Sequence, residues 1–412
     1  MVDVSERIEG LVSESVKRVS RRGGDFEFPA DLKIRWAFEA GLPDPATFPL
    51  DDLERLTADV LHDDAADALQ YGSPGSNGIG WGYEILRDRI AERTLRIEGR
   101  EVDRRSVMLT LGGVQAITLA CRAFLDEGDL LAVEAPTWGA ALGAARQSGA
   151  EALAIPMDAE GMQVDVLSQE LARLEGEGKR LKMIYTIATF NTPTGWSLSL
   201  PRRRKLLELA NRYGFIVLED NVYGELRYEG ETIPTLFALD ESGLVVKIDS
   251  FSKILAPALR LGWVTGDPEV MRAIGAVKGD LGVSQWLARV VVRFMDEGKL
   301  DPHVAMVNEL YREKRDIAVR ALRDECGPWV NFDVPEGGFF IWIELSSDVD
   351  GEQVMQKAFA EGVMCRPGER FFGETDADAH KQWFRLAFIM VPKDELERGI
   401  TALGKAIADS AR

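Results

Sequence analysis

Two short stretches near the middle of the sequence carry side chains that can do chemistry together. The first ends an apolar segment at residues 215–223, and the second spans residues 250–260. Together they supply an acid, a phenol, hydroxyls, an amine and a guanidinium: Asp220, Tyr223, Ser250, Ser252, Lys253 and Arg260. A lysine amine can form a Schiff base, and an aspartate can pair with a pyridine nitrogen. The set therefore indicates a site for pyridoxal 5′-phosphate (PLP).

Each of these residues has a different expected role toward PLP. We expect Lys253 to form the Schiff base, Asp220 to contact the ring nitrogen and Tyr223 to contact the ring oxygen. Serine hydroxyls and an arginine are suitable donors to the phosphate: Ser250, Ser252 and Arg260. Taken singly, each residue also has an ordinary structural explanation, such as a surface lysine, a helix cap or a core tyrosine. Their combination and spacing favour the functional interpretation.

A second phosphate-binding element is predicted where a strand gives way to a helix. Gly112 and Gly113 separate the apolar segment 107–110 from a helical pattern that continues through Val114. Backbone amides at the start of such a helix point toward a bound anion, although a glycine pair can also be a plain turn. Trp138 is flat and suitably placed to stack on a cofactor ring, and a core position is the alternative.

Arg385 stands inside an otherwise apolar strand-like segment, residues 383–388. A buried charge is costly unless it is paired. Bidentate binding of a substrate carboxylate would explain this arginine, and a structural salt bridge is the alternative.

The totals for the chain exclude several classes of protein. Its 412 residues include 49 Lys and Arg against 68 Asp and Glu, a net charge of −19, which argues against binding to nucleic acid or an anionic membrane. No apolar run approaches the ~18 residues of a membrane span. The 3 cysteines and 3 histidines are scattered, so neither a disulfide framework nor a metal site is predicted. We expect a cytoplasmic enzyme without a metal.

Short apolar runs alternate with amphipathic stretches from about residue 105. Predicted strands occupy residues 107–110, 130–134, 182–186, 215–219 and 244–248, with helices at 114–126, at 138–148 and from Pro201 to Gly214. This order predicts an α/β fold with a large, mostly parallel mixed sheet between helices. Ligands bind at the carboxyl ends of the strands in such sheets, where the candidate residues fall.

The last part of the chain has a different pattern. A helical region at about 285–325 precedes predicted strands at 337–345 and 383–388, which indicates a smaller α+β domain. We predict an N-terminal segment (1–50) that packs on the small domain and the active site, a large PLP-binding domain (51–290) and a small C-terminal domain (291–412).

The order of these motifs resembles the class I/II aminotransferases of PLP fold type I, especially the branch that contains aminoadipate and kynurenine aminotransferases. The resemblance extends over nearly the whole chain, from residues 40–45 and 69–72 through Trp138 to Arg385. It implies that Lys253 also moves the proton on the substrate, and that Arg385, helped by backbone near Gly41, binds the α-carboxylate. It further implies a homodimer with shared active sites, in which Tyr71 reaches the phosphate in the neighbouring subunit.

Two departures from the family pattern are apparent. Thr192 stands where the family has an asparagine that hydrogen-bonds the ring oxygen. Thr192 is shorter, so it either fails to reach the ring oxygen or is compensated by a shift of Asn191. The glycine-rich segment 72–82 is about six residues longer than usual, which indicates a reshaped loop at the entrance or a surface insertion.

The leading hypothesis is an aminotransferase that converts an α-amino acid to a 2-oxo acid. The second keeps PLP but ends in elimination, replacement, decarboxylation-dependent deamination or oxidation, and Thr192 and the 72–82 loop motivate it. A third, a non-catalytic PLP-fold binding protein, conflicts with the intact Lys253, Asp220 and Arg385.

Overall fold

The computed structural model describes residues 8, 10–20, 33–72, 79–372 and 380–411. Its largest feature is an eight-stranded sheet with spatial order β2-β9-β8-β7-β6-β3-β4-β5. The strands in that order are β2 (Val107–Thr110), β9 (Gly262–Thr265), β8 (Val245–Ser250), β7 (Ile216–Asp220), β6 (Leu181–Thr186), β3 (Leu130–Ala135), β4 (Glu151–Asp158) and β5 (Gly161–Met162). The central pairs are parallel and the pairs at both sides are antiparallel. The mostly parallel mixed sheet predicted from the sequence is confirmed.

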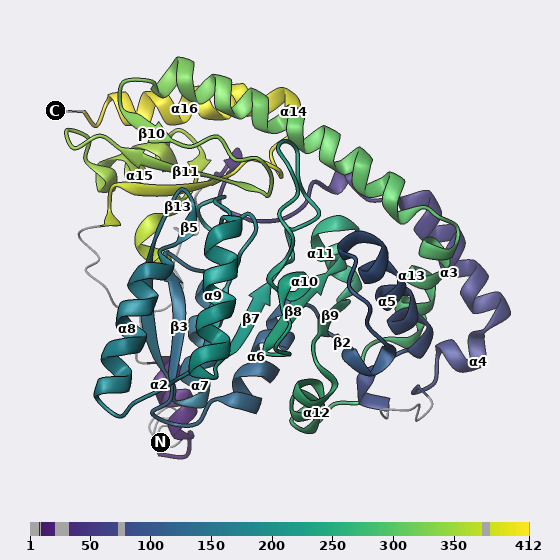
Figure 1. Ribbon diagram of the computed structural model, residues 1–412. Coiled ribbons are helices and arrows are strands. Elements are labelled where there is room, and N and C mark those ends of the chain that lie inside the picture. The colour runs from purple at the N-terminus through teal and green to yellow at the C-terminus, as the bar shows by residue number, and fades with distance from the viewer. Residues whose placement is uncertain (1–7, 9, 21–32, 73–78, 373–379, 412) are drawn as a thin grey trace, which may run out of the picture.

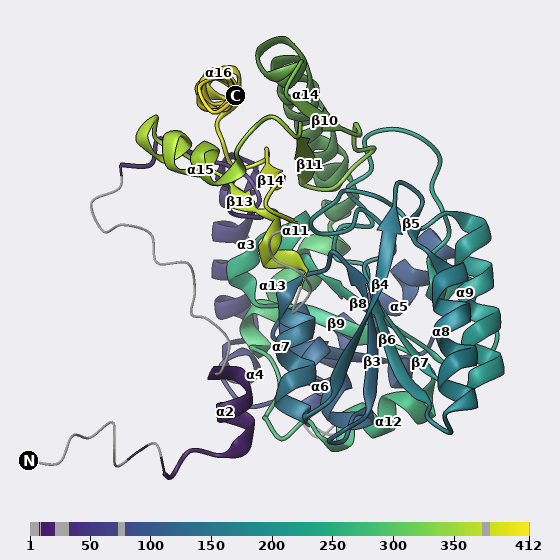
Figure 2. The same ribbon diagram turned by 90° about the vertical axis from the view of Figure 1, so that its left-hand side faces the viewer.

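Helices cover both faces of this sheet (Figure 2). One face packs against α6 (Gly113–Phe124) and α7 (Gly139–Ser148), and the other packs against α8 (Val164–Gly176), α9 (Leu200–Tyr213) and α10 (Leu236–Leu239). Alternate residues of a strand point to opposite faces, so apolar residues at every position are expected in a strand covered on both sides. Strand β7 follows this rule, since Leu218 packs in one cluster and Val217 in the other.

The predicted helix boundaries around α9 are confirmed. Ser199 is the residue before the helix, a proline lies in the first turn, and Gly214 ends the helix with φ 69°. Three strands of the large sheet, β4, β5 and β9, were not predicted. The predicted helical region at 285–325 consists of two helices, α13 (Gln285–Asp296) and α14 (Leu300–Cys326).

A smaller four-stranded sheet follows, with spatial order β10-β11-β14-β13. Its strands are β10 (Val330–Phe332), β11 (Phe340–Leu345), β14 (Trp383–Ala387) and β13 (Arg366–Pro367), and α14, α15 (Gly351–Ala360) and α16 (Leu396–Ala408) lie beside it. Helix α14 packs along α16 and extends over the large sheet's helices (Figure 1). The smaller α+β unit is therefore present, as predicted.

The N-terminal residues contact this second unit directly. Strand β1 (Trp36–Ala37) pairs in parallel with β12 (Val363–Met364). The remaining helices are α2 (Glu14–Ser20), α3 (Leu50–Asp63), α4 (Ala65–Ala68), α5 (Glu84–Glu98), α11 (Phe251–Ile254) and α12 (Pro268–Ala276). The predicted boundary at 290 falls inside α13, and the division at 50 and 290 stays a prediction. In the described ranges, no helix is both long and apolar enough to cross a membrane.

Candidate active site

The carboxyl ends of three strands, β2, β7 and β8, lie at one edge of the large sheet, and the antiparallel strand β9 lies between β2 and β8. Strands β7 and β8 are parallel and end at Asp220 and Ser250. Strand β2 runs in the same direction, because β9 is antiparallel to both β2 and β8, and it ends at Thr110. The loops after these strands line a cavity of about 760 Å³. All predicted site residues except Tyr71 line it: Gly41, Gly113, Val114, Trp138, Thr192, Asp220, Tyr223, Ser250, Ser252, Lys253, Arg260 and Arg385.

Lys253 lies on the short helix α11, directly after β8. Its Nζ donates a 2.7 Å hydrogen bond to the backbone carbonyl of Gly41 and lies 5.7 Å from the ring centre of Tyr223. Burial lowers the pKa of Lys253 to about 8; Asp220 opposes this shift, and Arg385 and Arg260 add to it. A lysine with this pKa is partly neutral near physiological pH, which is the form that attacks a carbonyl carbon.

Asp220 is fully buried at the end of β7. Its Oδ2 accepts a 2.8 Å hydrogen bond from the Tyr185 hydroxyl, and its Oδ1 accepts one of 3.4 Å from the Val222 amide. Burial raises the pKa of Asp220 to about 6, and the bond from Tyr185 opposes this shift. A cation beside Asp220 would stabilise the carboxylate, so the position suits a protonated pyridine nitrogen.

Tyr223 packs edge-on against Phe339 and Phe340, with ring centres 5.3 and 5.6 Å away. Burial raises the pKa of Tyr223 to about 12, and Thr192 opposes this shift. The phenol therefore stays protonated across the physiological range and can donate a hydrogen bond into the cavity.

The start of helix α6 and the segment after β8 form a cradle rich in hydrogen-bond donors. Gly112 precedes α6 with φ 88°, and a Cβ built there would lie 2.7 Å from Nη2 of Arg260. Arg260 itself has φ 50°, a conformation that is costly for a non-glycine residue. Its guanidinium donates to the carbonyl of Leu111 at 2.6 Å. Ser250 Oγ lies 2.9 Å from Ser252 Oγ, so both hydroxyls meet at the same edge.

The cradle, Lys253 and Asp220 together fit PLP. Helix α6 is 12 residues long, and its N-terminal amides and dipole favour an anion. A Cβ at position 112 would displace the guanidinium of Arg260 from its place beside this helix end. The buried carboxylate of Asp220 lies deeper in the same cavity, where a positively charged ring nitrogen would relieve its desolvation.

Arg385 enters the cavity from β14 and is 5% exposed. Its guanidinium lies 4.4 Å from the ring centre of Phe340 and donates to the backbone carbonyl of Glu39. Its Nε is buried and has no hydrogen-bond partner within the part of the chain that the structure describes. Burial lowers the pKa of Arg385 to about 9, and Arg366, its cross-strand neighbour, adds to this shift. A carboxylate bound here would offset both effects.

Asn191 does not take the place of the family asparagine that Thr192 replaces. The Asn191 side chain donates to Glu134 at 2.7 Å and accepts from Thr194, so it does not point into the cavity. Thr192 is buried and lines the cavity in its own right. Burial raises the pKa of Glu134 to about 7, while its donors Thr186, Ile187 and Asn191 oppose this shift. Asn191 thus belongs to a buried network behind the site.

Trp138 precedes α7 and is half-buried at the cavity wall. Tyr71 is 67% exposed and lies outside the cavity, beside Leu281 and Gln285. Most of the predicted entrance loop, residues 73–78, lies outside the described residues. In this region a Cβ at Gly82 would lie 2.8 Å from the Leu109 side chain.

Sequence reasoning missed several residues that contact the site. Tyr185 bonds Asp220 from β6, the strand beside β7. The signal for Tyr185 was a single hydroxyl-bearing ring in a strand that is buried at all but one position. Arg366 and Arg370 also line the cavity, and Arg366 is ion-paired with Glu39. These contacts depend on strand pairing that no local pattern encodes.

Comparison with known proteins agrees with this geometry. The family described as Aminotransferase class I and II matches residues 57–403. The aromatic-amino-acid aminotransferase 1 of Thermococcus litoralis is 39% identical over 374 residues, covering 90% of this chain and 88% of that protein. The 2-aminoadipate transaminase of Thermus thermophilus is 32% identical, covering 90% and 89%.

A solved structure is similar over the whole chain. The kynurenine aminotransferase of Pyrococcus horikoshii, crystallised in complex with PMP, has a TM-score of 0.85 and 34% identity, covering 100% of this chain and 96% of that one. The resemblance inferred from the sequence is confirmed: the chain belongs to the class I and II aminotransferases and is a PLP-dependent enzyme that transaminates amino acids.

Proposed function

We propose that this enzyme takes the amino group from an α-amino acid, releases the corresponding 2-oxo acid, and uses Lys253 as its proton carrier. The observation that carries the proposal is the position of the Lys253 amine, inside the cavity with Asp220 and Arg385 among the charges that act on it. PLP supplies an electrophilic carbon for the amino group and a ring that stabilises negative charge on the substrate's Cα.

The proposed work of Lys253 is to move a proton. Because burial lowers the pKa of Lys253 to about 8, the amine can accept a proton from Cα and return it to a neighbouring carbon without a large barrier. Its hydrogen bond to Gly41 holds the nitrogen at one place, which limits the atoms it can reach.

Asp220 is proposed to hold the ring nitrogen in its protonated form. Tyr185 fixes one carboxylate oxygen and leaves the other to the weaker bond from Val222. Tyr223 is proposed to donate to the ring oxygen, since burial raises the pKa of its phenol to about 12 and keeps it protonated. Thr192 lines the same wall.

The remaining residues are proposed to bind the two anions. Gly113, Val114, Ser250, Ser252 and Arg260 surround the expected phosphate position, and Trp138 lies at the wall where it can stack on the ring. Arg385, with the backbone near Gly41, is proposed to hold the α-carboxylate, because its buried Nε has no partner among the described residues. No observation favours elimination, replacement, deamination or oxidation over transamination.

We also infer a homodimer. The surface around Tyr71 exposes large apolar side chains: Leu69, Tyr71 and Leu281 are 67%, 67% and 55% exposed. Exposed apolar side chains gathered in this way are typical of an interface. In a dimer through this surface, Tyr71 would complete the phosphate site of the partner. A cytoplasmic location remains part of the same proposal.

A single-turnover experiment tests the proposed reaction. The holoenzyme is mixed with one amino acid and no oxo acid, across a broad set of amino acids that includes sulfur-containing ones. Transamination gives one equivalent of 2-oxo acid and of pyridoxamine phosphate per active site. Repeated turnover with release of ammonia would overturn the proposal.

A Lys253→Ala variant checks the role of the lysine in the same experiment. We expect it to lose the visible absorption band of bound PLP and to fall by at least about a hundredfold in turnover rate, the usual size of a positioned acid–base group. An active Lys253→Ala enzyme with an unchanged spectrum would contradict the assignment.

A further inference from the structure

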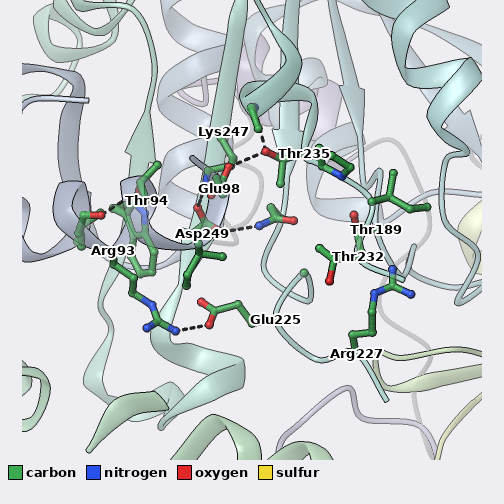
Figure 3. A pocket seen from close by; sticks show the side chains of 18 residues that line it. Arg93, Thr94, Glu98, Thr189, Glu225, Arg227, Thr232, Thr235, Lys247 and Asp249 are labelled. Carbon is green, nitrogen blue, oxygen red and sulfur yellow. Dashed lines mark hydrogen bonds and ion pairs between the residues drawn. The ribbon is translucent and has the colours of Figure 1, made fainter. Parts of the chain in front are cut away.

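A second cavity, of about 160 Å³ and lined by both apolar and charged side chains, lies behind the site, against the other face of β8 (Figure 3). Lys247 and Asp249 are two residues apart on β8 and point to the same face, away from Ser250. Lys247 Nζ lies 3.1 Å from Asp249 Oδ2 and also pairs with Glu98, at the end of α5. We refer to these three residues and Asn221 as the β8 cluster.

The ionised groups of the β8 cluster are almost fully shielded from water. Lys247 is 2% exposed, and the side chains of Glu98 and Asp249 are 12% and 11% exposed. Although burial disfavours the charged amine, the pKa of Lys247 lies above its ordinary value because Asp249 and Glu98 outweigh burial. Charges buried in this way add little to folding stability, and apolar residues of similar size often serve as well. A role in positioning is the alternative explanation.

The β8 cluster is connected to Asp220 through Asn221. The Asn221 side chain donates a 2.9 Å hydrogen bond to Asp249 Oδ1, and its backbone amide donates to the carbonyl of Ile248. The turn then closes with a 2.9 Å bond from the Gly224 amide to the Asn221 carbonyl. A Cβ at Gly224 would lie 2.2 Å from Asn221 Oδ1, so the amide side chain is clamped between Asp249 and the turn.

This turn carries one of the two hydrogen bonds that described residues donate to the Asp220 carboxylate. The Val222 amide that bonds Asp220 Oδ1 lies inside it, while Tyr185 bonds the other oxygen from β6. If Asn221 lost its contact with Asp249, the turn would no longer hold the Val222 amide in place. The Asp220 carboxylate could then rotate about its Cβ–Cγ bond. The orientation of Asp220 toward the cavity therefore depends on groups on the opposite face of the sheet.

We propose that Asp249, held by Lys247, which Glu98 holds in turn, is a positioning residue that fixes Asn221 and thereby orients the Asp220 carboxylate toward the ring nitrogen of PLP. This inference rests on the role proposed for Asp220. Arg93 and Glu225 also line this cavity, where they form an ion pair of their own (Figure 3). The β8 cluster at this cavity thus supports the cofactor site from the opposite face of the sheet.

The test measures the dissociation constant of PLP from the apo protein for Asn221→Ala, Asp249→Ala and the double variant. We expect each single variant to weaken PLP binding about tenfold, the effect of one lost hydrogen bond to a charged group. The double variant should be no weaker than either single one, because both changes break the same connection. Asp249→Asn retains an acceptor oxygen and should recover most of the affinity.

A PLP analogue with C–H in place of the ring nitrogen separates positioning from general damage. It offers Asp220 no partner, so Asn221→Ala should bind it as well as the wild type does. Leu171→Ala is the control, because Leu171 is buried in α8 outside the site and its truncation destabilises the fold without touching the β8 cluster. It should bind PLP with wild-type affinity.

Equal losses for PLP and the analogue, or unchanged PLP binding in both single variants, would overturn the inference. Asp220→Asn distinguishes this from a failure of the proposed function. If Asp220→Asn binds PLP as tightly as the wild type, the role of Asp220 itself is wrong. If it binds weakly while Asn221→Ala does not, only the positioning role fails.

Discussion

The amine of Lys253 donates a hydrogen bond to the carbonyl of Gly41, a residue that precedes it by 212 positions. This bond joins the segment that pairs with strand β12 to Lys253 on helix α11, which follows strand β8 of the large sheet. Gly41 can approach so closely because it lacks a side chain: a Cβ there would lie 2.8 Å from Cζ of Phe340, which is 1% exposed. The N-terminal segment is therefore part of the site.

Gly41→Ala should lower activity more than it lowers stability. The new methyl group must move either residues near 41 or the Phe340 ring, which packs against both Tyr223 and Arg385. A displacement of this kind near a reacting group costs up to about a hundredfold in rate. The measurement is kcat and KM with one amino acid, beside thermal unfolding. Gly176→Ala, in α8 with nothing near its Cβ, is the control and should behave as the wild type.

The rate at which the apo protein captures PLP should depend on pH through Lys253. Burial lowers the pKa of Lys253 to about 8, so the neutral fraction of the amine rises between about pH 7 and pH 9. The capture rate should rise through the same window and level off above it. Asp220→Asn should move the curve to lower pH, since Asp220 raises the pKa of Lys253.

A free lysine side chain provides the reference for this pH series. The rate at which a small lysine derivative reacts with PLP should keep rising as the pH approaches 10.5, the ordinary pKa of lysine. Dividing the capture rate of the protein by this rate removes the effect of the titration of PLP itself. A midpoint near 10.5 for the protein would contradict a buried, partly neutral Lys253.

Most strands of the large sheet, and the residues at its carboxyl edge, could be predicted from the sequence. Asp220 and Ser250 end strands whose five or six positions are all buried, so apolar runs marked both strands and their ends. Strand β4 was missed because it lies toward the side of the sheet, mostly exposed, and carries a proline. Strand β9 is four residues long and follows too closely on Arg260 to stand out.

Contacts set by strand register could not be predicted. The pairing of Arg366 with Arg385 across β13 and β14 places two like charges side by side, which no local pattern in either segment reveals. The bond from Tyr185 to Asp220 likewise depends on the parallel pairing of β6 with β7. Asp249 accepts a hydrogen bond from Asn221, the residue that follows the neighbouring strand β7, and this contact became apparent only in the fold.

Gly112→Ala should weaken PLP binding through the phosphate cradle. The substitution combines an unfavourable φ of +88° with a Cβ only 2.7 Å from Arg260 Nη2. We expect at least about tenfold weaker binding of PLP, from the lost charge-assisted bond, and little change for pyridoxal, which has no phosphate. Binding of both ligands is followed by absorbance titration.

Gly128→Ala separates backbone strain from the loss of the arginine contact. Gly128 has φ +83° and open space around its Cβ, and it lies in the turn before β3. Its substitution should cost about 1–2 kcal/mol of folding stability from the left-handed backbone alone. PLP affinity should stay at the wild-type value; equal losses of affinity in both variants would show that strain, not Arg260, is responsible.

Arg385→Ala should raise the KM for the amino acid substrate far more than it changes PLP binding. The guanidinium is buried, its Nε has no partner among the described residues, and burial lowers its pKa to about 9, so it gains most from a bound carboxylate. Loss of a bidentate, charge-assisted pair predicts an increase of about a hundredfold in KM. Arg385→Lys should recover little, because an ammonium cannot bind the carboxylate with two parallel bonds.

The exposed Arg173, paired with Glu170 and Glu177 on the surface, is the control, and Arg173→Ala should leave KM unchanged. A primary amine that lacks the α-carboxylate sharpens the test: its weak turnover should be equal in the wild type and Arg385→Ala. An equal loss for the amine and the amino acid would show that Arg385 supports the fold of the site rather than the substrate.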